Sequence, residues 1–482
     1  MISMSADLPD HPSPPAADLA RMEAIFALQA EAYGRYPMPG LAERMRNLAT
    51  LRTLLADHSE AIAAAINADF TARSADETRL AEIMPCMQHI DHTLKRLGGW
   101  MKPDTRSAGL QFFPASARVV YQPLGVVGII VPFNYPVNLS LIPLATALAA
   151  GNRAMLKLSE FTPRTAVLLQ EMLRKGFDED LVAVVTGETE IAAAFSRLPF
   201  DHLLFTGSTA IGKHVMRAAA ENLTPVTLEL GGKSPAIIAD DMPLTDIIDR
   251  LCFAKSLNAG QTCVAPDYVL IPRDKLDAFM LLYKAAFNKM FPTLNGNPHY
   301  TSIINAHAHQ RLHEWLKDAA RKGAKIVSTS DEPITDGTFR MPLHLVTGVN
   351  DEMKIMQHEL FGPILPLIPY DTIEAALAYV RQRPRPLSLY LFTHDRALQE
   401  QVMLTTHAGS MCINDAVIQV GVDNLPLGGI GQSGMGQYHG HEGFLTMSKA
   451  KPVMRKGKLN PMKLIYPPYG AIHKWLMKWL IR

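Results

Sequence analysis

The sequence predicts an α/β protein whose centre is a doubly wound parallel sheet. Five short, continuously apolar runs are separated by segments with helical periodicity, and strands of this kind are buried on both faces by helices. Ligands of such sheets bind at the carboxyl ends of the strands. The runs are residues 126–131, 154–158, 181–185, 202–206 and 226–230, with helices near 139–150, 164–176, 190–198 and 210–222.

The same alternation starts again after residue 234 and continues to residue 414, which predicts a second α/β domain. Before both domains, apolar residues at helical spacing predict helices from Asp18 to about Met101. The strands of the second domain are expected at 236–239, 268–271, 324–328, 343–349, 364–369, 387–392 and 410–414, and its helices at 244–257, 275–290, 306–322, 373–382 and 396–405.

Composition excludes several classes of protein. Lys and Arg number 47 against 46 Asp and Glu, and this balance argues against a nucleic-acid partner. The four cysteines are far apart, with no CxxC pair and no Cys/His cluster, so neither disulfides nor a metal site are expected. No secretory signal and no apolar run of about 18 residues occur, so we expect a cytoplasmic protein.

Polar side chains follow the first two strands, at the edge of the sheet where ligands bind. Asn134 lies in the turn after the first strand, where its amide could donate to a developing oxyanion or could simply form the turn. Lys157 and Glu160 follow the second strand. They could hold the hydroxyls of a nucleotide ribose, or they could be a solvated strand end.

A small-residue turn, with Gly207, Ser208 and Gly212, joins the fourth strand to the next helix. Glycines at such a junction let the backbone approach a pyrophosphate, and the start of the helix favours the anion. The turn is not the GxGxxG fingerprint, and turns of this composition are common.

Two residues are candidates for catalysis. Cys263 lies where a helix ends and a strand begins, among small and polar residues, which is typical of a nucleophile, although a lone cysteine is more often an inert core residue. Glu229 is a carboxylate inside an apolar strand, where burial should raise its pKa toward that of a general base. The alternative for Glu229 is a structural ion pair with Lys233.

Taken together and in this order, these sequence motifs resemble those of the NAD(P)-dependent aldehyde dehydrogenase superfamily, over residues 41–452. The motif His-Glu-Leu-Phe-Gly-Pro at 358–363 adds to the resemblance. The motifs at 260–268 and 434–440 are similar to those of the class 3 branch. The motifs at 134–139 and 441–445 are similar to those of bacterial coniferyl aldehyde dehydrogenases.

The resemblance implies a mechanism. Cys263 attacks the aldehyde as a thiolate, Asn134 and the Cys263 backbone N–H hold the oxyanion, and Glu229 activates the water that hydrolyses the thioester. It also implies NAD as the cofactor, with NADP possible. The cofactor would be held by Lys157, Glu160, Gly207, Ser208, Gly212, Glu359 and Phe361.

The resemblance further implies a small bridging β-sheet, in which the run near 118–122 pairs with a segment after Asp415, and a homodimer. We therefore expect five parts of the chain. They are a disordered arm (1–20), a dinucleotide-binding domain (21–101 and 124–230), a catalytic domain (231–414), bridging segments (102–123 and 415–469) and an amphipathic helix (470–482).

The substrate stays open at this stage. An aromatic enal such as coniferaldehyde and a medium- or long-chain aliphatic aldehyde both fit the resemblance. A CoA-acylating enzyme fits less well, because Glu229 supplies the base that hydrolysis needs and acylation does not. An inactive scaffold is disfavoured because the three catalytic residues are all present.

The C-terminal residues form an amphipathic cationic pattern that could lie on a membrane surface or dock on a partner subunit. Its apolar residues are Ile472, Trp475, Leu476, Trp479 and Leu480, and its cations are Lys474, Lys478 and Arg482.

Overall fold

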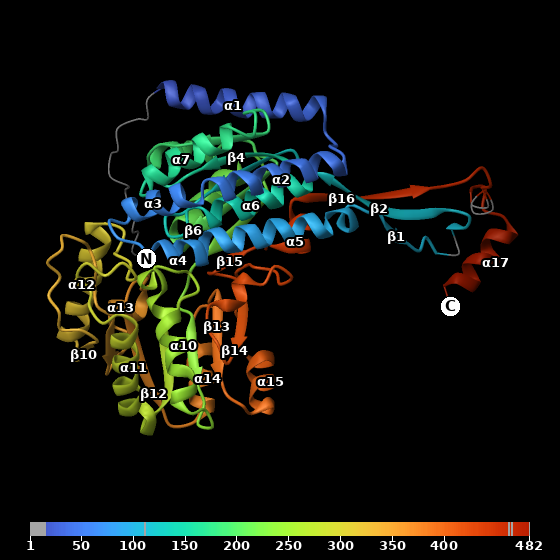
Figure 1. The fold of residues 1–482 in the computed structure, drawn as a ribbon. Coiled ribbons are helices and arrows are strands. Elements are labelled where there is room, and N and C mark those ends of the chain that lie inside the picture. Colours follow the sequence, from blue (N-terminus) through green and yellow to red (C-terminus); the bar gives the residue numbers. More distant parts are fainter. Residues whose placement is uncertain (1–15, 110–111, 461–462, 464–465, 482) are drawn as a thin grey trace, which may run out of the picture.

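The computed structural model describes residues 16–481, apart from 110–111, 461–462 and 464–465. Within these residues the strands form three sheets, two in the body of the molecule and one in an arm that projects from it (Figure 1). Residues 1–15 of the predicted disordered arm lie outside the described residues. Residues 16–20 are a correction to that prediction, because they begin helix α1 (Ala16–Arg35).

The first sheet is the predicted doubly wound sheet, with strand order β15-β7-β6-β3-β4-β5. Val127 and Ile129 of β3 face a core built with helices α2, α3, α5, α6 and α7, whereas Val126 and Ile130 face α1, α8 and α9. Burial on both faces explains why these strands are continuously apolar. The parallel strands are β3 (Val126–Ile130), β4 (Arg153–Lys157), β5 (Val182–Val185), β6 (His202–Gly207) and β7 (Val226–Leu230). The helices are α2 (Leu41–Asp57), α3 (Ser59–Asp69), α5 (Met84–Trp100), α6 (Asn138–Ala150), α7 (Pro163–Arg174), α8 (Thr189–Phe195) and α9 (Thr209–Ala220).

The second sheet has the order β10-β11-β12-β9-β8-β13-β14, and only its edge strand β10 runs antiparallel to its neighbour within the described residues. Each strand coincides with a predicted apolar run. The strands are β8 (Pro235–Ile238), β9 (Tyr268–Pro272), β10 (Lys325–Ser328), β11 (His344–Thr347), β12 (Ile364–Tyr370), β13 (Ser388–Phe392) and β14 (Ser410–Ile413). The helices are α10 (Leu244–Ser256), α11 (Leu276–Met290), α12 (Ala306–Arg321), α13 (Lys354–Gln357), α14 (Ile373–Arg381) and α15 (Arg396–Thr405).

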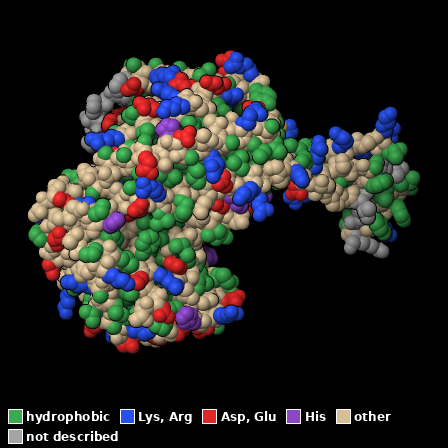
Figure 2. Space-filling view, viewed as in Figure 1, with side chains coloured by type: hydrophobic (Ala, Val, Ile, Leu, Met, Phe, Trp, Pro, Cys, Tyr) green, Lys and Arg blue, Asp and Glu red, His purple; other side chains and the backbone are tan. Residues whose placement is uncertain are grey.

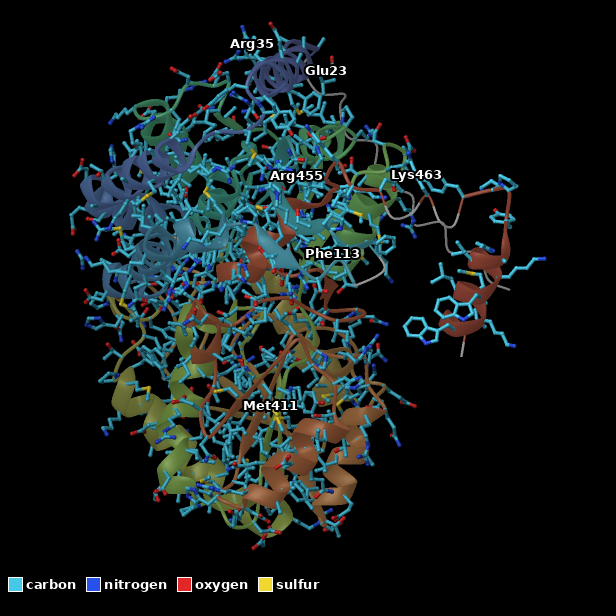
Figure 3. The ribbon with its side chains drawn as sticks, turned by 90° about the vertical axis from the view of Figure 1, so that its right-hand side faces the viewer. Glu23, Arg35, Phe113, Met411, Arg455 and Lys463 are labelled. Atoms are coloured by element: carbon cyan, nitrogen blue, oxygen red, sulfur yellow. The ribbon has the colours of Figure 1, made fainter. Side chains whose placement is uncertain are left out.

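The third sheet forms the arm and contains β1 (Asp104–Arg106), β2 (Ser116–Pro123) and β16 (Ser448–Arg455), all antiparallel. The pairing of β2 with β16 is the one predicted for the bridging sheet. Helix α17 (Ala471–Leu480) lies at the end of the arm (Figure 1), where apolar side chains gather on the surface (Figure 2). Seen along the arm, α17 stands to one side of the body (Figure 3).

The glycine-rich segment before β16 corrects the predicted bridging segment 415–469. Its strand β15 (Gly434–Met435) pairs with β7, with Gly434 opposite Glu229, and helix α16 (Gly440–Thr446) packs on α6 and α5. A Cβ on Gly434 would lie 2.0 Å from the Leu228 carbonyl oxygen, so only glycine allows this approach. This part of the chain therefore belongs to the first domain.

No helix within the described ranges is long and apolar enough to cross a membrane.

Candidate active site

A cavity of about 390 Å³ lies at the carboxyl edge of the first sheet. It brings together Glu229 on β7 and Cys263, the two residues that the sequence singles out for catalysis. Most of the remaining lining is apolar, and it includes residues of α5, of the segment after α10 and of the stretch 417–421. Asn134 does not line the cavity, although its neighbour Tyr135 does.

Cys263 follows a backbone segment of unusual conformation. In the 3-10 turn Leu257–Gly260, Asn258, Ala259 and Gly260 have φ values of 52°, 51° and 75°, which is the left-handed region. Only Gly260 adopts it without strain, and a Cβ there would lie 2.5 Å from the Gly362 carbonyl oxygen. Strained conformations of this kind persist only where the surroundings hold them.

Hydrogen bonds around Asn258 provide that support. Its side-chain nitrogen donates to the backbone oxygens of Asn134 (3.0 Å) and Gln261 (3.1 Å), and its backbone N–H donates to Glu77 (2.9 Å). The Gln261 amide donates to the backbone oxygens of Asn258 and Ser302, both at 3.0 Å. The turn before Cys263 is therefore tied to the loop that carries Asn134.

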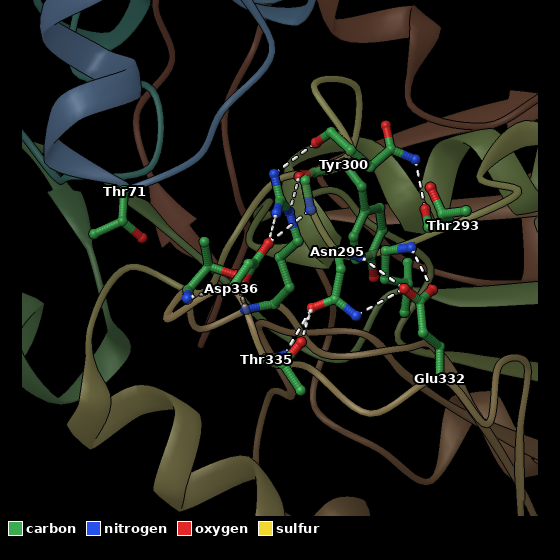
Figure 4. Close-up of polar contacts among 12 residues, drawn as sticks. Thr71, Thr293, Asn295, Tyr300, Glu332, Thr335 and Asp336 are labelled. Carbon is green, nitrogen blue, oxygen red and sulfur yellow. Dashed lines mark hydrogen bonds and ion pairs between the residues drawn. The ribbon is translucent and has the colours of Figure 1, made fainter.

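The segment that supplies Ser302 is itself braced by buried and partly buried polar contacts (Figure 4). Asn295 donates to Glu332 at 2.7 Å, and Arg340 donates to the Tyr300 carbonyl oxygen at 3.0 Å and pairs with Asp336. These contacts hold the segment that accepts the Gln261 hydrogen bond, next to the turn before Cys263.

Arg73 joins the loop that carries Asn134 to the turn before Cys263, and the sequence did not predict it. Its side chain is fully buried and donates to the Asn134 carbonyl oxygen at 2.7 Å. Nitrogens of Arg73 lie 3.5 Å from Glu77 and 3.4 Å from Glu82, and the guanidinium stacks 4.9 Å from the Tyr135 ring.

Glu82 completes this cluster by accepting the backbone N–H groups of Val137 (2.9 Å) and Asn138 (2.8 Å). The only sequence signal was the five charged residues at 73–82 in a predicted helical stretch, which a solvated helix face would also give.

Burial raises the pKa of both candidate catalytic groups. Burial, and then the charges of Glu359 and Glu229, raise the pKa of Cys263 to about 12. Burial raises the pKa of Glu229 well above its ordinary value, as the sequence predicts, and its Oε1 has no hydrogen-bond partner among the described residues. A deprotonated Glu229 could therefore accept a proton from a thiol or a water in the cavity.

The alternative interpretation of Glu229 as an ion pair with Lys233 is wrong. Lys233 pairs with the carboxylate of Asp267 and donates to the backbone oxygens of Ile355 (2.8 Å) and His358 (3.0 Å).

The residues predicted to hold the adenosine end lie at the same sheet edge but outside the cavity. Lys157, buried at the end of β4, lies 3.7 Å from Glu160, and burial lowers its pKa. Ser208 accepts the Ile211 N–H at 3.4 Å and so caps α9. Gly212 packs directly against Leu230, which brings the start of α9 close to the sheet.

The residues predicted to hold the nicotinamide end lie beside the nucleophile turn. A Cβ on Gly231 would lie 1.9 Å from a carboxylate oxygen of Glu359, and burial raises the pKa of Glu359 to about 8. Phe361 has a φ of 47° and packs edge-to-face on Phe133, with centroids 5.7 Å apart. A buried cation beside a carboxylate, with glycines that leave room along the edge, fits a dinucleotide.

The chain matches the family described as "Aldehyde dehydrogenase family" over residues 13–453. The chain belongs to the aldehyde dehydrogenase family. It is 56% identical over 466 residues to a probable coniferyl aldehyde dehydrogenase of Pseudomonas aeruginosa, covering 96% of this chain and 97% of that protein. It is 38% identical over 428 residues to aldehyde dehydrogenase family 3 member A2 of Rattus norvegicus, covering 88% and 87%.

Among solved structures, a substrate-bound state of Staphylococcus aureus AldH superposes with a TM-score of 0.90 at 33% identity, covering 95% of this chain and 99% of that chain. These matches confirm the predicted family, its class 3-like branch and its fold. This aldehyde dehydrogenase is thus an NAD(P)-dependent oxidoreductase that acts on aldehydes.

A pH profile of kcat tests Glu229 as the general base. A base works in its ionised form, so a raised pKa shifts the onset of activity upward, and kcat should still rise with pH through neutrality. Glu229→Gln should lower kcat by about 10²- to 10⁴-fold and remove this rise. Steady-state rates from about pH 6 to pH 9 measure both effects. The exposed Glu221→Gln is the matched control, and a Glu229→Gln enzyme that keeps the wild-type profile would exclude the role.

Proposed function

We propose that this enzyme oxidises an aromatic enal, such as coniferaldehyde, to the free carboxylic acid, with NAD as the preferred cofactor. The observation that carries the proposal is the single apolar cavity that holds both Cys263 and Glu229. An apolar cavity of about 390 Å³ is within the size range of small-molecule sites, about 300–1,000 Å³. The name of the Pseudomonas aeruginosa relative supports the aromatic substrate.

In the proposed mechanism, the Cys263 sulfur attacks the aldehyde carbon and its proton passes to Glu229. The backbone N–H of Cys263 and the Asn134 side chain stabilise the oxyanion that forms. NAD, when bound, supplies the hydride acceptor. The acyl group then remains on Cys263 as a thioester. Glu229 releases the thiol proton to solvent and then takes a proton from the water that hydrolyses the thioester.

For the cofactor, we propose that Lys157 and Glu160 hold the adenosine ribose, and that Gly207, Ser208 and Gly212 lie along the pyrophosphate. Glu359 and Phe361 would hold the nicotinamide end. The Glu160 carboxylate accepts a ribose 2′-hydroxyl and repels a 2′-phosphate, which favours NAD over NADP.

The alternative substrate is a medium- or long-chain aliphatic aldehyde. The aliphatic part of the lining, including Leu80, Met84 and Ile418, favours this alternative. Transfer of the acyl group to CoA is disfavoured, because Glu229 supplies the base that hydrolysis of the thioester needs and that transfer to CoA does not.

NADH formation from coniferaldehyde, benzaldehyde and hexanal tests the proposed function. Without CoA, coniferaldehyde should give the highest kcat/KM, the rate with NAD should exceed that with NADP, and Cys263→Ser should abolish turnover because the nucleophile is lost. Cys412→Ser, a half-buried cysteine outside the cavity lining, is the matched control. A higher kcat/KM for hexanal would favour the aliphatic alternative, and turnover only with CoA would contradict the hydrolytic mechanism.

We also propose a cytoplasmic homodimer formed through the arm. The arm carries exposed apolar side chains that a second copy could cover. Its amphipathic helix α17, with Lys474 and Lys478 beside two exposed tryptophans, supports a further contact with a membrane surface. These apolar side chains are Phe113, Met454, Leu459, Tyr469, Ile472, Trp475, Trp479 and Ile481.

Deleting residues 471–482 separates the two contacts. The β2–β16 pairing does not include α17, so the shortened protein should still sediment as a dimer. It should lose flotation with anionic vesicles if α17 binds lipid. A full-length protein that sediments as a monomer would contradict the dimer, and equal flotation of both forms would contradict the membrane contact.

A further inference from the structure

One wall of the cavity carries a polar atom that the proposed reaction does not use. His439 is 4% exposed and lines the cavity, and its Nε2 has no hydrogen-bond partner among the described residues. Its backbone φ is 110°, a conformation that side chains with a Cβ rarely adopt. An unpaired buried nitrogen on strained backbone is costly, and such features concentrate where a ligand is bound.

Three described side chains that line the cavity have a buried polar atom without a partner, and they lie on two walls. Thr206 and Glu229 are opposite each other on the paired strands β6 and β7, on the wall proposed to carry the reaction. His439 lies between β15 and α16 and packs against His89 of α5, with ring centroids 5.5 Å apart. His439 thus lines the cavity from the side of α5, whereas Thr206 and Glu229 line it from the sheet.

We propose that the Nε2 of His439 binds a hydroxyl group on the ring of the aromatic aldehyde and thereby selects phenolic substrates. This inference rests on the proposed function, because it requires an aromatic aldehyde bound in the cavity. Coniferaldehyde carries its aldehyde and its phenolic hydroxyl at opposite ends, which matches two separate polar points in an apolar cavity. A ring without a hydroxyl would leave the buried nitrogen unpaired, and sites built around a hydrogen bond discriminate against ligands that lack it.

The protonation of His439 agrees with a neutral hydroxyl ligand. Burial, and then the neighbouring His89, lower the pKa of His439 to about 3. A neutral imidazole nitrogen either donates or accepts one hydrogen bond, and a hydroxyl can do both, so either tautomer suits a phenol. A phenolate or a carboxylate would suit only the tautomer with a proton on Nε2.

Replacing His439 while comparing two aldehydes tests the inference. Coniferaldehyde and cinnamaldehyde share the enal and the ring, but only coniferaldehyde carries the ring hydroxyl. His439→Phe should lower kcat/KM for coniferaldehyde by about tenfold, the size of one lost hydrogen bond, and leave cinnamaldehyde within about threefold. His439→Gln, whose amide can replace Nε2, should retain most of the preference.

Equal losses on both aldehydes in His439→Phe would overturn the inference, since they would indicate a structural role. The wild-type enzyme provides a second measurement that needs no variant: kcat/KM for coniferaldehyde must exceed that for cinnamaldehyde, and equal values would also overturn it. Failure of the proposed function would look different, because the wild-type enzyme would then turn over neither aldehyde.

Discussion

The geometry of the candidate active site depends most on the contacts of the buried Arg73 guanidinium. The guanidinium donates a hydrogen bond to the Asn134 carbonyl oxygen and pairs with Glu77. Glu77 in turn accepts a hydrogen bond from the backbone N–H of Asn258, in the turn before Cys263. The loop that carries Asn134 and the turn before Cys263 are therefore held together through one shared charge, that of Arg73. Removing either partner of a buried charged cluster leaves an uncompensated charge, so the cluster acts as a unit.

This arrangement accounts for the strain in the turn before Cys263. Asn258 and Ala259 are not glycines, yet both adopt the left-handed conformation. Hydrogen bonds between Asn258 and three neighbours hold that conformation in place. The neighbours are Asn134, Glu77 and Gln261. Preorganised geometry of this kind is worth most where an oxyanion must meet its donors without further movement.

The sequence predicted the strands of both large sheets except β15. Burial on two faces requires continuous apolar runs, and such runs are visible in the local sequence. The candidate nucleophile and the candidate base were predicted for a similar reason, since Cys263 and Glu229 stand out against their immediate neighbours. Arg73, Glu77 and Glu82 could not be predicted in this way. Their partners lie elsewhere in the chain, and a solvated helix would carry the same residues.

Contacts between residues far apart in the sequence also explain why two other features of the structure were not predicted. The glycine-rich segment was assigned to the bridging part because nothing local indicates that β15 returns to the edge beside Glu229. His439 also does not stand out in the sequence. Its importance follows from its position in the cavity lining and from the unpaired Nε2. Motifs identified the chemistry, whereas the three-dimensional structure was needed to find the residues that position it.

The most direct test of this account is kcat in Arg73→Lys, measured beside NAD affinity and thermal stability. Lysine keeps the charge but cannot reach Asn134, Glu77 and Glu82 together. We predict a fall in kcat of about 10²-fold, as expected for displaced reacting groups, with unchanged NAD affinity in a folded protein. Arg79→Lys, in an exposed pair with Glu60, should change nothing. An unchanged kcat in Arg73→Lys would contradict the account.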